Sequence, residues 1–254
     1  FGTFLINTLT EGQVDVSLAQ RSDTFTTLAF VSIAEDGERD FVFSRGADKE
    51  LTHDIRLKNL FKDQIVHFGA ATSFLGGSLE EAYSLYLQEA ISHNSFICFD
   101  PNFRADLWKG TEEIFIQKCL PFVEKSDLCK FSLEEAQLLS KKEDLKEACT
   151  FLHQLGTKII TVTLGGEGTY LSTPSIQKII PSIKVKPVDT TGAGDAFIGC
   201  LLKQISLTTN LDALLADSGL LEKMVQDANK AGAITTLNYG AIESLPSQEQ
   251  INQV

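Results

Sequence analysis

The sequence predicts an α/β protein built on a mainly parallel sheet, with a small antiparallel β unit attached. After about residue 51, short apolar runs typical of buried strands alternate with helical stretches of about 10 to 15 residues. This alternation is typical of βαβ units, whose sheets are parallel and covered by helices on both faces. Upstream, two β-prone runs flank Asp36-Gly37, a pair that favours a hairpin turn.

The composition limits the classes of function. The chain has 254 residues, which suits one large domain or a domain with a small appendage. Its 22 Lys and Arg residues against 34 Asp and Glu residues give a net charge of −12, so we expect neither a nucleic-acid partner nor a membrane partner. Its apolar runs are shorter than the roughly 18 residues that span a bilayer. The five cysteines form no Cys-x-x-Cys pair and predict buried thiols in a reducing, cytoplasmic protein.

The first residues predict a helix followed by the antiparallel unit. Apolar residues recur at helical spacing in Gly2–Leu9. Strands are expected at Phe25–Ile33 and Phe41–Phe43, within a unit of residues 12–48. Because a βαβ sheet normally begins with a strand, we expect an N-terminal portion of at least about 30 residues to precede this helix.

The rest of the chain alternates strands and helices. The predicted strands share short, apolar, β-prone sequences and span Gln64–Phe68, Phe96–Phe99, Leu128–Phe131, Lys158–Thr163 and Thr169–Ser172. The predicted helices share apolar residues at helical spacing and span Ser78–Ser92, Thr111–Lys125, Leu133–Leu139, Leu145–Leu155, Ala193–Gln204 and Leu220–Thr236. Such a sheet binds ligands at the carboxyl ends of its strands, where functional side chains are therefore expected.

The sharpest local signal is Gly192-Ala193-Gly194-Asp195, which leads into a helical run. The free N–H groups of a first helical turn and the helix dipole form an anion hole suited to a phosphoryl group in transfer. Asp195, ionised in that turn, can accept a proton from a substrate hydroxyl. An ordinary N-terminal cap would give the same short pattern. The turn is not a Walker A loop, which requires G-x-x-x-x-G-K-[ST]. It is not a dinucleotide fingerprint either, because Phe197 stands at the third glycine position.

The longer string Asp-Thr-Thr-Gly-Ala-Gly-Asp-Ala-Phe at residues 189–197 closely resembles the C-terminal signature of the ribokinase family of carbohydrate kinases, of phosphofructokinase-B type. Other segments resemble family motifs in the same order. Phe99–Arg104 with Leu107-Trp108 is similar to the D-P-N-x-R…L-W segment of fructokinases and keto-deoxygluconate kinases. Lys130–Glu135 is similar to the N-x-x-E region, with Ser132 in place of Asn, and Thr163–Gly168 resembles the T-x-G-x-x-G loop.

This resemblance implies an architecture for the whole chain. The family's N-terminal strand and glycine-rich sugar segment have no counterpart in the sequence, whereas the remainder matches throughout. The implied fold is a ribokinase-like three-layer sandwich with a mainly parallel central sheet. Residues 12–48 correspond to the β lid, and residues 1–11 and 49–254 to the kinase core.

The resemblance also implies catalytic roles. Asp195 corresponds to the general base that activates the sugar hydroxyl. The anion hole corresponds to the three residues before it, Gly192, Ala193 and Gly194. Arg104, expected just past a strand end, can pair with a phosphoryl oxygen or a polar sugar group in fork geometry. A surface pair between Arg104 and Asp106 is the alternative.

The implied cofactors are ATP and Mg²⁺, with K⁺ as a further cation. The nucleotide loop and adenine wall correspond to Thr163, Gly165, Gly168 and Asn229, although a plain hairpin turn also explains the glycines. Ser132 and Glu135 match the magnesium side, where Glu135 acts through water, but their spacing is also that of a capping box. The residues that match the family's K⁺ loop are Asp189, Thr191, Thr235, Asn238, Gly240 and Ser244.

The expected sugar contacts come from the lid and from the segment after the second sheet strand. Phe43 and Arg45 match lid positions that face the sugar, although packing within the lid is the favoured explanation for Phe43. Asp100 and Asn102 bind the sugar or shape their loop. Lids of this family close over the sugar and exclude water, and they often pair between subunits, which implies a homodimer through the lid.

The implied function is that of an ATP-dependent sugar kinase, most closely a fructokinase that converts fructose and ATP into fructose 6-phosphate and ADP. The segment Phe41-x-Phe43-x-Arg45 favours fructose. The alternatives are a 2-keto-3-deoxygluconate kinase, a nucleoside or riboside kinase, and a non-catalytic sugar- or nucleotide-binding protein. The presence of Asp195 argues against a non-catalytic protein, because loss of the base is the simplest mark of an inactive kinase.

Overall fold

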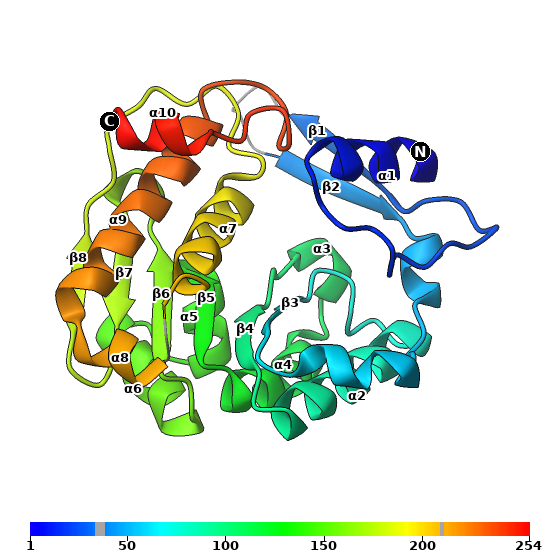
Figure 1. The fold of residues 1–254 in the computed structure, drawn as a ribbon, viewed down its shortest axis with the longest axis horizontal. Coiled ribbons are helices and arrows are strands. Elements are labelled where there is room, and N and C mark those ends of the chain that lie inside the picture. The colour runs from blue at the N-terminus through cyan, green and yellow to red at the C-terminus, as the bar shows by residue number, and fades with distance from the viewer. Residues whose placement is uncertain (34–38, 209–210) are drawn as a thin grey trace.

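The computed structural model describes residues 1–33, 39–208 and 211–254 and confirms the α/β class (Figure 1). The main sheet has six strands in the order β3-β4-β5-β6-β7-β8, and β1 and β2 form a separate two-stranded sheet. The main strands are β3 (Ile65–Gly69), β4 (Phe96–Asp100), β5 (Leu128–Ser132), β6 (Ile159–Thr163), β7 (Thr169–Ser172) and β8 (Gln177–Ile180). Strands β3 to β6 are parallel, as predicted, and β7 and β8 are antiparallel.

Helices cover both faces of the main sheet and give the three layers (Figure 1). One face carries α2 (Ser78–Ser92), α4 (Glu112–Lys125), α5 (Leu133–Ser140) and α6 (Leu145–Leu155); the other carries α7 (Ala193–Ile205) and α9 (Ser218–Thr235). Alternate strand residues divide between two hydrophobic cores. Phe99 and Phe131 pack with the first set of helices, whereas Cys98 and Leu128 pack with the second. The central strands β4, β5 and β6 are mainly apolar because both of their faces are buried.

The predicted antiparallel unit consists of β1 (Leu28–Ile33) and β2 (Arg39–Ser44), which pair along their full length. The predicted turn pair Asp36-Gly37 lies outside the described residues. Helix α1 (Gly2–Glu11) runs beside this small sheet (Figure 1). Strand β2 contacts the short helix α3 (Ala105–Trp108), so the small sheet lies at the edge of the main sheet where β4 ends. The division into a lid of residues 12–48 and a kinase core stays a prediction.

The structure differs from the sequence prediction at several elements. The pattern does not predict β8, an edge strand of four residues whose first three are exposed, because two polar residues followed by two isoleucines show no strand periodicity. Strand β1 begins at Leu28 rather than Phe25, because the Phe25 carbonyl accepts a hydrogen bond from Ala47 outside the ladder. The helical segments too short to show periodicity are α3, α8 (Leu211–Ala216), α10 (Gln248–Asn252), and the 3₁₀ turns Ala47–Glu50, Ile55–Phe61 and Gly165–Glu167.

The cysteines are free thiols. Four of them are buried, and Cys200 is half-buried. Burial raises the pKa of Cys129 and of Cys149 to about 12, so these two groups stay protonated and unreactive. Within the described ranges, no helix combines the length and the apolar character needed to cross a membrane.

Candidate active site

Helix α7 begins at the predicted glycine-rich turn, where the backbone requires glycine. Gly192 has a φ of +80°, in the left-handed region, and a Cβ at this position would lie 2.7 Å from the Cβ of Ala241. Ala193 and Gly194 then border a cavity of about 470 Å³. A helix N-terminus at a cavity provides N–H donors and the positive end of the helix dipole, so this cavity is suited to an anion. Asp195 follows in the same turn and is exposed.

This cavity collects the four residues that the sequence assigns to the nucleotide. Thr163, Gly165, Gly168 and Asn229 all line it, although they come from β6, the following turn and α9. The remaining walls include residues 182–185 and Pro187, which follow β8. The volume lies in the range of small-molecule sites. The cavity, named the nucleotide cavity below, therefore brings the predicted residues together, while their individual contacts stay predictions.

Of the three glycines in the turn after β6, the two that the sequence assigns to the nucleotide, Gly165 and Gly168, have different surroundings. Gly168 has a φ of +113°, and a Cβ there would lie 2.1 Å from the carbonyl oxygen of Ile180, so packing against the end of β8 excludes a side chain. Gly165 also has a left-handed φ, of +58°, but the space around it is open. The backbone N–H of Leu164 donates to the Gly168 carbonyl at 2.8 Å, so the hairpin explanation of this turn also holds. Because Gly165 has no side chain, its backbone atoms line the cavity directly.

Asn229 holds two walls of the nucleotide cavity together. Its Nδ2 donates to the carbonyl of Ile180 at 2.9 Å, and its Oδ1 accepts from the hydroxyl of Thr169 at 2.6 Å. The side-chain amide of Asn229, the hydroxyl of Thr169 and the carbonyl of Ile180 therefore all have hydrogen-bond partners, although these residues are buried. The side chain therefore acts at least as a brace between α9 and strands β7 and β8.

Replacing Asn229 by Ala is expected to lower the free energy of unfolding by about 1–3 kcal/mol, because the buried partners Thr169 and Ile180 lose their hydrogen bonds. The affinity for ADP is expected to fall as the cavity wall loosens. Urea denaturation and ADP titration measure the two effects. Asn59→Ala, at an exposed position remote from the cavity, is the matched control and should change neither quantity. Unchanged stability in the Asn229 variant would contradict the bracing role.

Both carboxylate oxygens of Asp100, at the end of β4, have partners inside the protein. Asp100 is buried, and its Oδ2 forms an ion pair with Lys130 Nζ at 3.0 Å. Its Oδ1 accepts from the backbone N–H of Asn102 at 3.2 Å, which supports a left-handed φ of +51° at that residue. Of the two predicted roles, these contacts favour the shaping of the loop. A sugar contact by Asp100 or Asn102 stays a prediction.

Ser132 and Glu135 form the predicted capping box at the start of α5. The Ser132 hydroxyl accepts from the Glu135 N–H at 3.1 Å, and Glu135 Oε2 accepts from the Ser132 N–H at 2.7 Å. Glu135 Oε1 accepts from the N–H of Phe103 at 2.7 Å, which joins this cap to the loop after β4. Burial, together with nearby Asp100, raises the pKa of Glu135.

The oxygen atoms of Ser132 and Glu135 are compatible with one kind of magnesium site. Within the described residues, no group of three or more His, Cys, Asp or Glu side chains is placed to hold a metal ion. Glu135 is only 4% exposed and already accepts two backbone hydrogen bonds. A strongly hydrated Mg²⁺, held by nucleotide phosphates and reached by Glu135 through water, fits this arrangement, whereas a cage of protein ligands does not.

Arg104 occupies the N-cap position of α3, where its side chain makes no capping hydrogen bond, and it is half-buried. Its Nη1 donates to the carbonyl of Phe103 at 2.9 Å. In the part of the chain that the structure describes, Arg104 makes no ion pair with Asp106, so the alternative surface pair is not formed. The residue lies at the carboxyl edge of the sheet, as predicted, but its contact with a phosphoryl or sugar group is untested.

The two predicted lid residues occupy different surroundings. Phe43 lies opposite Ala29 in the β1–β2 ladder and is half-buried. Arg45 follows the end of β2, and its Nε and Nη2 donate to Asp48 at 3.0 and 2.9 Å. Asp48 also accepts a hydrogen bond from the hydroxyl of Thr27. Burial raises the pKa of Asp48, but the hydrogen bonds from Thr27 and Arg45 outweigh burial and lower it. Arg45 therefore stands in an ion pair at the base of the small sheet.

The segments assigned to the K⁺ loop do meet in space. Asp189 Oδ1 accepts from the N–H and hydroxyl of Thr191 at 3.0 and 2.7 Å, and its Oδ2 accepts from the N–H of Gly240 at 3.3 Å. The Ser244 hydroxyl donates to the carbonyl of Tyr239 at 3.1 Å. The other two members of the predicted set are Thr235, which is buried, and Asn238, which is exposed. Bound K⁺ at this loop stays a prediction.

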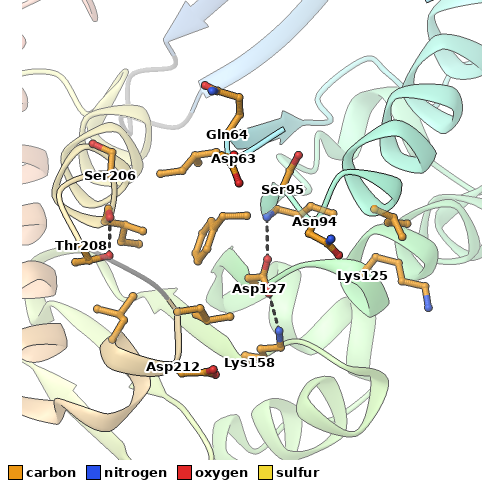
Figure 2. A pocket seen from close by; sticks show the side chains of 17 residues that line it. Asp63, Gln64, Asn94, Ser95, Lys125, Asp127, Lys158, Ser206, Thr208 and Asp212 are labelled. Atoms are coloured by element: carbon orange, nitrogen blue, oxygen red, sulfur yellow. Dashed lines mark hydrogen bonds and ion pairs between the residues drawn. The ribbon is translucent and has the colours of Figure 1, made fainter. Parts of the chain in front are cut away.

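A larger cavity, of about 970 Å³, lies at the opposite edge of the sheet (Figure 2). Its residues Gln64, Ser95 and Asp127 each precede a strand, so they mark the amino ends of β3, β4 and β5. Asp127 accepts from the N–H of Ile97 at 2.9 Å and pairs with Lys158 at 2.8 Å. Because parallel sheets bind ligands at the carboxyl ends of their strands, the smaller cavity at α7 is the better candidate for the active site.

The profile of the pfkB family carbohydrate kinases matches residues 1–248, nearly the whole chain. The chain belongs to the pfkB family of carbohydrate kinases. The curated relatives include Fructokinase-1 of Oryza sativa subsp. japonica, 34% identical over 230 residues that cover 89% of this chain and 70% of the relative. Another is Fructokinase-1 of Zea mays, 33% identical over 259 residues that cover 100% of this chain and 79% of the relative.

Solved structures of the family share the fold. A fructokinase from Vibrio cholerae O395 with fructose, ADP and calcium ion bound is 27% identical, with a TM-score of 0.82 over 99% of this chain and 80% of that protein. A fructokinase from Xylella fastidiosa with bound ATP is 25% identical, with a TM-score of 0.85 over 100% of this chain and 80% of that protein. The kinase family and the ribokinase-like fold expected from the sequence are confirmed.

Some residues at the carboxyl edge of the sheet carry no recognisable signal in the sequence. Thr169, in the predicted strand β7, and residues 182–185 with Pro187 line the nucleotide cavity but carry no motif, and the latter segment follows the unpredicted strand β8. Lys130 lies within a matched segment without an assigned role. Its signal is a charged residue inside an apolar strand run, which is unusual unless the charge is paired.

Proposed function

We propose that the protein is an ATP-dependent fructokinase, which transfers the γ-phosphoryl group of ATP to fructose and releases fructose 6-phosphate and ADP. The observation that carries the proposal is at the start of α7, where Gly194 borders the nucleotide cavity and Asp195 is the next residue. The turn thus joins an anion-binding helix end to an exposed carboxylate. The choice of fructose is supported by the curated relatives, which are fructokinases, and by a similar structure that holds fructose.

In the proposed reaction, Asp195 removes the proton of the attacking sugar hydroxyl, whose oxygen forms a bond to the γ-phosphorus. The bond from that phosphorus to the bridging oxygen breaks, and ADP leaves with the electron pair. The N–H groups at Gly192–Gly194 hold the negative charge on the transferring group. Arg104, at the same edge of the sheet, is proposed to bind a phosphoryl or sugar oxygen. Bound Mg²⁺ supplies further charge neutralisation at the phosphates.

Finer properties of the enzyme belong to the same proposal. We propose that K⁺ binds at the loop that joins Asp189 to Gly240, where two chain segments meet through hydrogen bonds. A homodimer through the small sheet is supported by Phe30 and Val42, paired neighbours that are 58% and 62% exposed. A reducing, cytoplasmic location is supported by the free cysteines.

An assay of ADP release tests the proposal on the full-length protein, with fructose, keto-deoxygluconate, ribose and nucleosides as acceptors. We expect ADP release that depends on fructose and on Mg²⁺ and that is faster in K⁺ than in Na⁺. Release with another acceptor alone would keep the transfer mechanism and overturn the choice of fructose. A folded protein that binds ATP and releases no ADP with any acceptor would contradict the enzymatic proposal.

A further inference from the structure

Lys130 is a buried lysine in the middle of a core strand. It is 8% exposed, and its neighbours along β5, Cys129 and Phe131, are fully buried. An ammonium group in such a place is costly unless it is paired, so packing alone does not explain this residue. Lys130 belongs to the part of β5 that approaches the carboxyl edge, where the active site lies.

Carboxylates surround the ammonium group on several elements. Its Nζ pairs with Asp100 on β4 at 3.0 Å, and Glu135 on α5 and Asp195 on α7 are within electrostatic reach. On β3, burial lowers the pKa of His67, and the charge of Lys130 contributes to this lowering. Burial by itself would lower the pKa of Lys130, but the three carboxylates outweigh burial and raise it. The side chain is therefore positively charged at neutral pH.

The charged end of Lys130 lies against Gly194, the second glycine of the turn. A Cβ on Gly194 would lie 3.1 Å from Lys130 Nζ, which is closer than side chains normally approach. The φ of Gly194, unlike that of Gly192, lies outside the left-handed region, so backbone freedom is not the reason for glycine here. The missing side chain lets the ammonium group reach the underside of the first turn of α7.

We propose that Lys130 is a positioning residue for phosphoryl transfer, because its ammonium group, held by Asp100 beneath Gly194, adds a positive charge behind the anion hole. The inference rests on the proposed kinase function. During transfer, negative charge spreads over the oxygens of the phosphoryl group, and a preorganised cation behind the turn stabilises that charge without having to move. Lys130 also cancels the charge of Asp100, which would otherwise repel the phosphoryl group from the same place.

A merely structural lysine would have one task, the neutralisation of buried Asp100. The two roles are separated by comparing Asp100→Asn with Asp100→Asn/Lys130→Met. In both proteins residue 100 is neutral, so neither leaves a charged residue 100 buried without its partner, and Glu135 keeps its two backbone hydrogen bonds in both. Only the first protein keeps the cation beneath Gly194.

The expected result is a loss of kcat without a matching loss of stability. We expect the double variant to have a kcat about 100-fold below that of Asp100→Asn, the size of effect seen when one stabilising group of a transition state is removed. Its KM for ATP should stay close to that of Asp100→Asn, and its urea midpoint should be no lower, because Asp100→Asn leaves the buried ammonium group without its carboxylate partner. Lys158→Met is the matched control, since Lys158 pairs with Asp127 at 2.8 Å at the far edge of the sheet, and it should leave kcat unchanged.

Equal kcat values for Asp100→Asn and the double variant would overturn the proposal and leave Lys130 as a structural counter-ion. A joint fall of kcat and the urea midpoint in the double variant would also overturn it, because lost folding would then explain the lost activity. Failure of the kinase function itself is recognised separately, by the absence of acceptor-dependent ADP release in the unmodified protein.

Discussion

Replacing Asp195 by Asn is expected to lower kcat for fructose phosphorylation by about 10²- to 10⁴-fold, the range for loss of a general base. Asn has the same shape but accepts no proton, so the sugar hydroxyl must attack without deprotonation. Because Asp195 is exposed in the first turn of α7, the fold should lose only about 0.3–1 kcal/mol from the changed helix end. ADP release at saturating fructose and ATP measures kcat, and ADP titration should show nearly unchanged nucleotide affinity.

A matched control for this variant exists elsewhere in the chain. Asp212 also lies in the first turn of a helix, α8, and is exposed, but it borders the larger cavity at the opposite edge of the sheet. Asp212→Asn therefore changes the same kind of helix end without touching the proposed site, and kcat should not change. An Asp195→Asn protein that keeps more than about a tenth of its kcat would exclude Asp195 as the general base.

Replacing Gly192 by Ala is expected to impair both folding and catalysis. A side chain at a left-handed φ of +80° costs about 1–2 kcal/mol, and the contact of 2.7 Å with the Ala241 Cβ adds about 1–3 kcal/mol of overpacking. Relief of this contact would move the start of α7 away from the nucleotide cavity. Since a displacement of about 1 Å can cost about 100-fold in rate, we expect kcat to fall by a similar factor. Urea denaturation and the ADP-release assay measure the two effects.

Two further variants separate the causes of that loss. Gly192→Ala/Ala241→Gly removes the contact between side chains but keeps the backbone strain, so it should recover part of the lost stability. Gly199→Ala, in the same helix, meets no atom within 4 Å and should stabilise α7 by about 0.5–1 kcal/mol. A Gly192→Ala protein as stable as the unmodified one would show that the turn does not require glycine.

The sequence predicts the sheet well where local signals are strong. Strands β4 and β5 lie within one residue of their predicted limits, because burial on both faces makes them mainly apolar runs, interrupted in β5 by Lys130. The capping box at Ser132 and Glu135 is likewise local, since its two hydrogen bonds join residues three apart. Strand β8 is exposed at its first three residues and is recognisable only through its pairing with β7.

By itself, the amino-acid sequence determined the family, the order of the βαβ units and the glycine-rich turn that precedes Asp195, because these depend on residues close together in the chain. Only the tertiary structure decided which residues meet at that turn. The pair of Lys130 with Asp100 joins residues 30 apart, and the brace from Asn229 to Ile180 joins residues 49 apart. Such contacts leave no periodic pattern, because they arise from the packing of neighbouring strands and helices, and they place the charge and the walls of the proposed active site.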